Sequence, residues 1–427
     1  MDAATVDGYL RTARRALDDA PPLGDPAYPR FAAYAREHLD RLWDRIVAAS
    51  TADVARCRER GLPERLLRRI AMTDTQRRTA YTLIERLPDE LRAAVAPAPV
   101  VIGPRRTRAR KIPRPLGVLL MIYEARPSVT IDGTLLPVCA GNAVILRGGT
   151  EIGATNAVLA EAFTAALTDA GLPIGLVQIL TDLDRAGLRA LLARDDAIDV
   201  LIPRGSPSLT DACRAVSRIP MIIGGGGVNH LYVHADADMD LAVRAVLDGK
   251  LYEPEGCTAL ECVLVDAPVR PAFWKTLAAY AGEMSEVVLR VDADLMGEVP
   301  PTLRMEERTE ADLGREYLTR TLCVHAVGDL DDAIKHIRRY GSGHSEAIIT
   351  RNRIVADQFC AHVDAAAVIV NGSVRLHDAP ILGLGSEIAI STSRLHVRGP
   401  VTLRDLMSHS WRVDGDGALR FRTTGEE

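Results

Sequence analysis

Apolar residues recur three and four positions apart through most of the first ninety residues of the chain. This spacing places apolar side chains on one face of a helix, so we predict a helical N-terminal region. Prolines at positions 21–22 and within residues 97–99 interrupt and close the pattern. The repeat is carried by Leu39, Leu42, Ile46, Leu66, Leu67, Ile70, Tyr81 and Ile84.

The pattern changes near residue 115, where short apolar runs begin to alternate with helical stretches. Strand–helix–strand order needs crossover connections, which are right-handed and produce a parallel sheet. Ligands bind such sheets at the carboxyl ends of the strands. The predicted strands are residues 116–123, 143–146, 176–180, 199–202 and 221–223, and the predicted helices are residues 159–170, 185–193 and 208–217.

A second alternating stretch begins near residue 231 and ends near residue 390. It predicts a second α/β unit, as expected for 427 residues, which exceed the size of one ordinary core. Residues 415–427 predict a short strand with a frayed end. The strands predicted for the second unit are residues 262–265, 322–325, 347–349 and 367–370.

Composition and charge indicate a folded, globular protein without nucleic-acid or membrane partners. The content is 47% hydrophobic and 26% charged, which suits a folded, globular chain. A net charge of -5 and a pI near 6.1 give no reason to expect nucleic acid as a partner. The longest apolar run, residues 117–123, is far too short to span a bilayer, and the polar N-terminus lacks a signal-peptide core. We therefore expect a cytoplasmic protein without a membrane partner.

Seven cysteines are spread along the chain without a Cys-x-x-Cys pair. The odd number in a large chain argues against a disulfide framework. No His/Cys cluster has the spacing of zinc ligands, so the sequence predicts no metal site. Most of these cysteines are expected to be buried packing residues, with room for one reactive exception.

Two turns that follow predicted strands could bind a phosphate. Arg147, Gly148 and Gly149 lie between a strand and a helix, and Arg204, Gly205 and Ser206 lie in the same place one crossover later. Helix N-terminal amides and a cationic side chain favour an anion. Each turn alone is equally consistent with a plain tight turn, whereas two at equivalent places favour a nucleotide site.

Residues 224–227, hereafter the glycine run, follow another predicted strand. They are consistent with a flexible linker or with close approach of the backbone to a ligand. Cys257 lies in a Glu-Gly-Cys-Thr-Ala stretch, where local sequence favours a buried packing cysteine over a nucleophile. For His230, His344 and His396, a hydrogen-bonded structural role is favoured over catalysis.

Several longer stretches are similar to one enzyme family. Residues 115–118, 123–130, 141–149, 202–205, 340–348 and 383–392, and then residues 396–400, resemble γ-glutamyl phosphate reductases. This family, also called glutamate-5-semialdehyde dehydrogenase, is part of the aldehyde dehydrogenase superfamily. The matches are long and keep their order along the chain.

The resemblance implies an α/β, aldehyde dehydrogenase-like fold with two parallel α/β domains and a small β oligomerisation arm. Residues 1–98 and 114–230 would form the cofactor-binding domain, and residues 231–399 the catalytic domain. Residues 99–113 and 400–427 would form the arm of a homodimer or homotetramer. NADPH is the implied cofactor, and an upstream acyl kinase is a candidate partner.

The resemblance also assigns roles to individual residues. Cys257 aligns with the nucleophile, Glu316 would contact the nicotinamide ribose, and Arg147 would lie near the adenosine end, where it could favour a 2′-phosphate. Cofactor contacts are also predicted for the two strand-end turns. Substrate contacts are predicted for Glu124, Arg126, Asn229, His230 and Arg375.

The implied reaction is reduction of an acyl phosphate through a thioester. Cys257 would attack the acyl carbon, backbone amides would stabilise the oxyanion, and phosphate would leave before hydride transfer. The glycine run fits this route, because hydrolytic relatives have a glutamate near this place. The aldehyde, glutamate 5-semialdehyde, cyclises to a precursor of proline.

Three departures from the family pattern leave the substrate open. Thr258 replaces an asparagine, Gly314 stands near the place of a tryptophan, and Ile381 replaces an acidic residue. A paralogue that reduces another activated acyl group is therefore an alternative. A catalytically silent nucleotide-binding protein is a further alternative, against which the presence of Cys257 and Glu316 argues.

Overall fold

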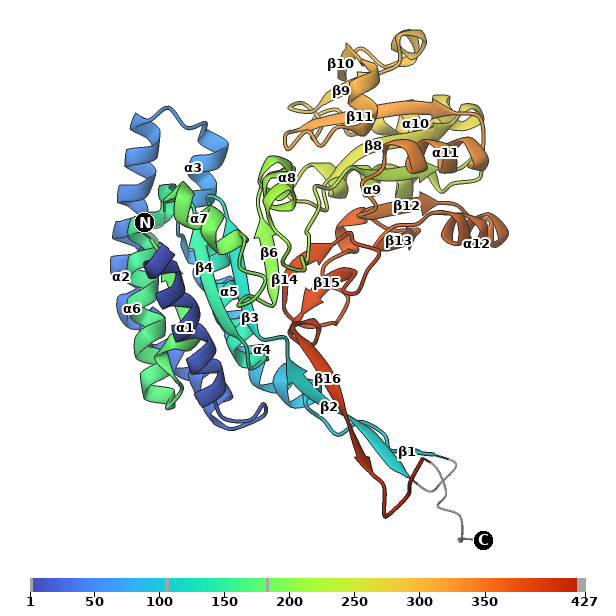
Figure 1. Cartoon of the computed structure of the whole chain (residues 1–427). Coiled ribbons are helices and arrows are strands. Elements are labelled where there is room, and N and C mark those ends of the chain that lie inside the picture. Colours follow the sequence, from blue (N-terminus) through green and yellow to red (C-terminus); the bar gives the residue numbers. More distant parts are fainter. Residues whose placement is uncertain (1–2, 104–106, 182–183, 421–427) are drawn as a thin grey trace, which may run out of the picture. The chain divides into compact units, whose positions relative to one another are not determined.

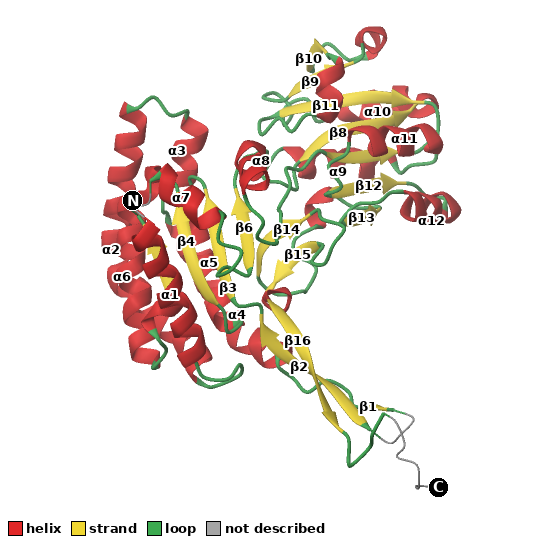
Figure 2. Cartoon of the chain, in the orientation of Figure 1, coloured by secondary structure: helices red, strands yellow, loops and turns green. Residues whose placement is uncertain are grey.

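The computed structural model describes residues 3–103, 107–181 and 184–420 of the chain (Figure 1). The chain forms two compact units. The first unit comprises Met1–Ile222, Gly385–Ile388 and Val401–Glu427, and the second comprises Ile223–Leu384 and Ala389–Pro400. Each unit contains its own parallel sheet flanked by helices (Figure 2), which confirms the predicted α/β fold class.

The N-terminal region is helical, as its periodicity predicted. Helix α4 begins with a capping box, in which the Thr73 and Gln76 side chains satisfy each other's backbone amides. The carboxylate of Asp53, fully buried on α2, accepts hydrogen bonds from the amide and hydroxyl of Thr155 and so fastens α2 to the start of α6. The four helices are α1 (Ala3–Asp19), α2 (Ala27–Glu59), α3 (Glu64–Ile70) and α4 (Asp74–Ala94).

The first unit contains a four-stranded parallel sheet in the order β5-β4-β3-β6. Its strands agree with the prediction except at residues 221–223, which are not a strand, because Met221 makes only an isolated bridge to Leu201. The strands are β3 (Val118–Tyr123), β4 (Ala143–Gly148), β5 (Val177–Leu180) and β6 (Val200–Arg204). The helices that connect them are α5 (Pro127–Cys139), α6 (Gly153–Ala170), α7 (Arg185–Leu192) and α8 (Pro207–Val216).

Helix α5 was not predicted from the sequence. It is buried on almost every side, so it lacks the one-sided apolar stripe that reveals a surface helix. It also contains Pro137 and begins with Pro127, and a proline inside a pattern argues against a helix. Tertiary burial therefore overrides local propensity in this segment.

The second unit contains a seven-stranded parallel sheet in the order β10-β9-β11-β8-β7-β12-β13. The four strands predicted here are present as β8, β11, β12 and β13, whereas β7 and the short strands β9 and β10 were missed. The strands are β7 (Asn229–Val233), β8 (Leu260–Asp266), β9 (Val288–Val291), β10 (Arg304–Glu307), β11 (Thr321–Val327), β12 (Ser345–Ile349) and β13 (Ala367–Val370). The helices are α9 (Met239–Lys250), α10 (Arg270–Ala278), α11 (Leu330–Tyr340) and α12 (Arg353–His362).

A separate antiparallel sheet, β1-β2-β16, contains the segments predicted to form the arm. Its strands are β1 (Val101–Ile102), β2 (Arg108–Pro115) and β16 (Met407–Asp414). The C-terminal strand thus precedes the predicted stretch: residues 415–420 contain no strand, and residues 421–427 lie outside the described part. Strand β16 was missed because its side chains are mostly exposed and polar. Strands β14 (Glu387–Ser391) and β15 (Gly399–Thr402) form a further two-stranded sheet.

Candidate active site

The glycine run lies against two predicted site residues of the second unit. A Cβ atom added to Gly227 would lie 1.7 Å from the carbonyl oxygen of Cys257. A Cβ atom on Gly226 would lie 2.6 Å from Oε2 of Glu316. Only glycine permits such close approach, so at Gly226 and Gly227 the run packs against the protein itself and is not a free linker. The absence of side chains at Gly226 and Gly227 lets the Cys257 loop and the Glu316 side chain both pack against the backbone of the run.

Asn229, at the start of β7, holds the Cys257 loop in place. Its Nδ2 donates to the carbonyl oxygens of Cys257 at 2.8 Å and Ala259 at 2.6 Å, and its Oδ1 accepts the amide of Ser345 at 3.1 Å. The side chain is fully buried. Asn229 was predicted to contact substrate, but its enclosed position and its three hydrogen bonds give it a positioning role instead.

Cys257 is exposed in the loop between α9 and β8, whereas Cys57, Cys139, Cys213, Cys262 and Cys323 are buried. The prediction of mostly buried cysteines is therefore confirmed, whereas the buried position that local sequence favoured for Cys257 was wrong. Cys360 is the second exposed cysteine and lies on α12. An exposed thiol satisfies the first requirement of a nucleophile, which is access to substrate.

Arg375 contacts the Cys257 loop at two residues, one on each side of Cys257. Its Nη1 donates to the Thr258 hydroxyl at 2.9 Å, and its Nη2 forms an ion pair with Glu253. A Cβ atom on Gly256 would lie 2.7 Å from the same Nη1, so the guanidinium packs directly on the residue before Cys257. The departure from the family at position 258 thus supplies a hydrogen-bond partner for this cation.

Glu316 accepts the amide of Gly227 through Oε1 at 2.9 Å. An ion pair between Lys250 and Glu261 is buried nearby, with 2.6 Å between Nζ and Oε2, and Lys250 attracts Glu316 electrostatically. Burial lowers the pKa of Lys250 and raises the pKa of Glu261 to about 8, while the attraction between them opposes both shifts. This pair was not predicted from the sequence, because no local pattern shows that two residues on neighbouring elements are partners.

His230 lies away from this surface. Its side chain is fully buried, and its Nδ1 lies 2.9 Å from Oε2 of Glu346. A substrate at the Cys257 loop cannot contact an imidazole enclosed in the core, so the predicted substrate contact is not supported. The preference for a structural histidine at this position agrees with the structure.

The predicted cofactor residues of the first unit lie at the carboxyl edge of its sheet. In the strand register Gly148 pairs with Tyr123, and Tyr123 also pairs with Arg204. The strand order reverses between β3 and β6, because β4 and β5 follow on one side of β3 and β6 on the other. Crevices at such reversals are where open parallel sheets bind nucleotides.

The side chains at this edge show which groups can meet an anion. The Glu124 carboxylate accepts the Ser206 amide at 2.8 Å, and a Cβ atom on Gly205 would lie 2.5 Å from its Oε2. The Ser206 amide is therefore already used, and the predicted substrate residue Glu124 supports the turn. By contrast, Nη1 of Arg204 is buried without a hydrogen-bond partner, so this nitrogen can donate to an anionic ligand.

The turn after β4 is shaped by the protein's own side chains. A Cβ atom on Gly148 would lie 2.5 Å from Nδ2 of Asn156, and one on Gly149 would lie 2.0 Å from Oε1 of Glu151. These glycines therefore do not by themselves indicate a ligand. Arg147 is the last residue but one of β4, and Arg126 is the N-cap residue of helix α5.

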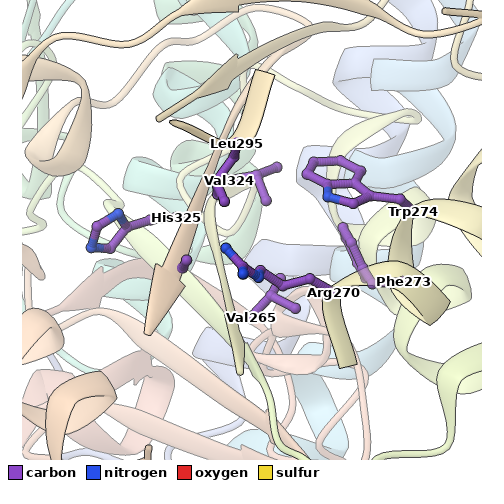
Figure 3. Close-up of a pocket in the computed structure, with 8 residues that line it drawn as sticks. Val265, Arg270, Phe273, Trp274, Leu295, Val324 and His325 are labelled. Carbon is purple, nitrogen blue, oxygen red and sulfur yellow. The ribbon is translucent and has the colours of Figure 1, made fainter. Parts of the chain in front are cut away.

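A small cavity in the second unit lies elsewhere (Figure 3). Its lining is apolar apart from Arg270 and His325, and it includes none of the predicted site residues.

None of the described helices combines the length and the apolar character needed to cross a membrane.

Comparison with known proteins identifies the family. The model of the aldehyde dehydrogenase family matches residues 44–294. A γ-glutamyl phosphate reductase of Chloroflexus aggregans is 41% identical over 88% of this chain and 90% of the relative, and that of Symbiobacterium thermophilum is 39% identical over 98% and 100%.

Solved structures agree with this assignment. The crystal structure of γ-glutamyl phosphate reductase from Thermotoga maritima matches with a TM-score of 0.87 and 29% identity, over 97% of this chain and 100% of that one. An engineered glycolyl-CoA reductase with bound NADP+ shares the fold at 15% identity and a TM-score of 0.68, over 96% of each chain. The chain belongs to the γ-glutamyl phosphate reductase family of the aldehyde dehydrogenase superfamily.

Proposed function

We propose that this chain reduces L-glutamate 5-phosphate to L-glutamate 5-semialdehyde and phosphate in proline biosynthesis, with NADPH as reductant and Cys257 as nucleophile. The observation that carries the proposal is the exposed Cys257 thiol on a loop held by Gly227 and Asn229, with Glu316 bonded to the same glycine. The names of the relatives favour this substrate over another activated acyl group.

The chemistry begins with attack of the Cys257 sulfur on the acyl carbon. A carbon–sulfur bond forms, the carbonyl oxygen becomes negative, and the carbon–oxygen bond to phosphate then breaks. Arg375 lies on this loop, so its positive charge is placed to stabilise the thiolate and the departing phosphate. The product of this half-reaction is a thioester on Cys257.

When bound, NADPH supplies a hydride to the thioester carbon. Glu316 is proposed to hold the nicotinamide ribose, because a carboxylate accepts the hydrogen bonds of its hydroxyl groups. Collapse of the resulting hemithioacetal expels the sulfur and releases the aldehyde. The overall reaction consumes one proton and restores the cysteine.

We assign the cofactor-binding domain to residues 1–98 and 114–230, the catalytic domain to residues 231–399, and the oligomerisation arm to residues 99–113 and 400–427. Arg147 at the end of the second strand would bind the 2′-phosphate of NADPH, since an arginine there replaces the acidic residue that binds the ribose of NAD. The unpartnered Nη1 of Arg204 would bind a phosphate of the cofactor.

The strands of the arm would connect the subunits of a homodimer or homotetramer. A kinase that phosphorylates a carboxylate must supply the substrate.

The test is the reverse reaction. Purified protein is given glutamate 5-semialdehyde, inorganic phosphate and NADP+, and formation of NADPH is followed by absorbance. We expect phosphate-dependent turnover, and we expect Cys257→Ala to lose it by several orders of magnitude because no other group forms the thioester.

Cys360→Ala is the matched control, because Cys360 is the other exposed cysteine among the described residues and lies on α12. It should retain the parental rate. Turnover with a different aldehyde but none with glutamate 5-semialdehyde would overturn the substrate, and an active Cys257→Ala variant would overturn the nucleophile.

A further inference from the structure

Three potential metal ligands form a row across the sheet of the second unit. His230 on β7 pairs in register with Cys262 on β8, and Cys262 pairs in register with Cys323 on β11. Residues in register on neighbouring parallel strands project to the same face of a sheet. All three are buried, with at most 1% of the surface exposed.

Helix α11 adds a fourth group above this row. The ligand atoms of His230, Cys262 and His336 all lie within 4.8 Å of one another, and Cys262 Sγ lies 4.0 Å from His336 Nε2. The rings of His230 and His336 meet edge to face at 5.2 Å. Cys323 joins the set because its thiol is hydrogen-bonded to Cys262.

His230 has the arrangement of a metal-binding imidazole. Its Nδ1 is bonded to the carboxylate of Glu346, a residue that is also fully buried, while its Nε2 is buried without any hydrogen-bond partner. A carboxylate on one ring nitrogen fixes the tautomer and directs the lone pair of the other nitrogen toward the metal. Without a ligand, a buried polar atom of this kind destabilises the fold, because it has lost its hydrogen bonds to water.

Two other polar groups near this cluster, His325 and Arg308, already have a partner of their own. His325 Nδ1 is already bonded to Asp292, and Arg308 is paired with the same carboxylate. Figure 3 shows the side chains of His325 and Val324 on opposite sides of their strand.

We propose that His230, Cys262, Cys323 and His336 bind one zinc ion in the core of the second unit. Thiolate and imidazole ligands select zinc over magnesium or calcium, and four protein ligands define a structural site without an open position. Zinc bonds of about 2.0–2.3 Å place tetrahedral ligands roughly 3.3–3.8 Å apart, so the ligand atoms of His230, Cys262 and His336, which now lie within 4.8 Å of one another, need to close by up to about 1.5 Å. Binding releases the two thiol protons to solvent, and the buried ion is neutralised by the two thiolates.

Such an ion would fasten α11 to the middle of the sheet. The amide of Val228, next to the glycine run, donates to the hydroxyl of Ser342, which follows α11 by two residues. Zinc would therefore stabilise the support of the Cys257 loop without taking part in the reaction.

The experiment measures metal on the full-length Cys257→Ser protein, which lacks the exposed candidate nucleophile that could bind metal at the surface. The protein is loaded with zinc alone, freed of loosely held ions on a desalting column, and assayed by atomic emission. We expect one zinc per chain and a rise in melting temperature that a chelator reverses. Cobalt in place of zinc should give the charge-transfer absorption of a thiolate ligand.

Variants in the same background locate the ion. Cys262→Ser and Cys323→Ser should each lose the bound zinc, and Glu346→Gln, which leaves all four ligands in place, should weaken it by about 10–100-fold. Cys213→Ser is the matched control, because Cys213 is a buried cysteine of the first unit. It should keep the full amount.

Two results would overturn the site. One is a folded Cys257→Ser protein, checked by circular dichroism, that binds no zinc and gives no cobalt–thiolate absorption. The other is zinc that remains in Cys262→Ser and Cys323→Ser. Because all of these readouts are independent of turnover, the proposal can fail while the reductase activity stands.

Discussion

The two units place their predicted functional residues at opposite edges of their parallel sheets. In the first unit, Arg147 and Arg204 lie at the carboxyl ends of β4 and β6. In the second, Asn229 begins β7, Ser345 begins β12, and Cys257 shortly precedes β8, so these residues lie at the amino edge. Ligands generally bind open parallel sheets at the carboxyl ends of the strands; the predicted cofactor residues of the first unit lie at such ends, and the proposed nucleophile of the second does not.

The difference lies in what positions each site. A carboxyl edge offers a reversal of strand order, and the following helices begin there. The amino edge of the second unit has no such geometry, and its loop is instead held by a buried asparagine and a glycine that admits a carbonyl oxygen. The amino-edge site should therefore be the more sensitive to small changes in packing.

The largest effect is expected from Gly227→Ala. The added Cβ would overlap the carbonyl oxygen of Cys257, a backbone atom that cannot yield without moving the loop. We expect a loss of more than about 4 kcal/mol in unfolding free energy, or a stable protein with almost no activity. Urea unfolding and the reverse assay distinguish the two.

Gly153→Ala in the first unit is the control for this substitution. A Cβ atom there meets nothing within 4 Å, and the residue begins α6 with φ of -64°. Its stability should rise by about 0.4–1 kcal/mol, the usual gain when alanine replaces a helical glycine. A Gly227→Ala protein as stable and active as its parent would contradict the described packing.

The second expected effect is a loss of unfolding free energy in acid, caused by two buried histidines near the amino edge of the second sheet. The Ser345 hydroxyl lies 2.8 Å from Nδ1 of both His344 and His377, and burial lowers the pKa of His344 to about 3 and of His377 to about 4. Because both folded values are below the unfolded value of about 6.5, their stabilising contribution is complete above that pH and is lost as pH falls toward the folded values. Unfolding free energies at about pH 8 and about pH 5 should differ by about 2 kcal/mol for each histidine.

His377→Gln should reduce this dependence on pH, since one of the two groups that resist protonation is removed. His362→Gln is the control, because His362 is exposed on α12. An equal acid response in all three proteins would show that the pair is not its source.

The third effect concerns Asn229→Ala. The change leaves the carbonyl oxygens of Cys257 and Ala259 without their donor and the Ser345 amide without its acceptor. We expect a loss of about 3 kcal/mol in unfolding free energy and a fall in kcat, because the thiol is no longer held in position. A variant that lost stability but kept its kcat would show that the Asn229 side chain has no role in positioning Cys257.

The smallest effect tests the carboxyl edge. Arg147→Ala should raise the KM for NADPH by about tenfold or more, as expected when a charge-assisted hydrogen bond of about 1.5–3 kcal/mol is lost. The KM for NADH should change little, because that cofactor lacks the 2′-phosphate. Equal changes for both cofactors would remove the argument for NADPH selectivity.

Local patterns were sufficient for much of the fold. The apolar runs that became β3, β4, β8 and β12 are short and closed by turn residues, so their strand character depends on neighbours in the sequence. The N-terminal helices follow from apolar spacing in the same way. The family also emerged from contiguous motifs, and the comparisons confirm it.

Only the tertiary structure decided the features that depend on distant contacts. Helix α5 is formed by residues that show no one-sided pattern, because burial surrounds it. The place of Cys257 at an amino edge depends on contacts of its loop with Gly227 and Asn229, which lie 28 or more positions before it in the sequence. His230, Cys262 and Cys323 are far apart in the sequence and become neighbours solely because their strands pair in register. Sequence spacing therefore predicted no metal ligands, since it encodes the local backbone but not which strands lie side by side.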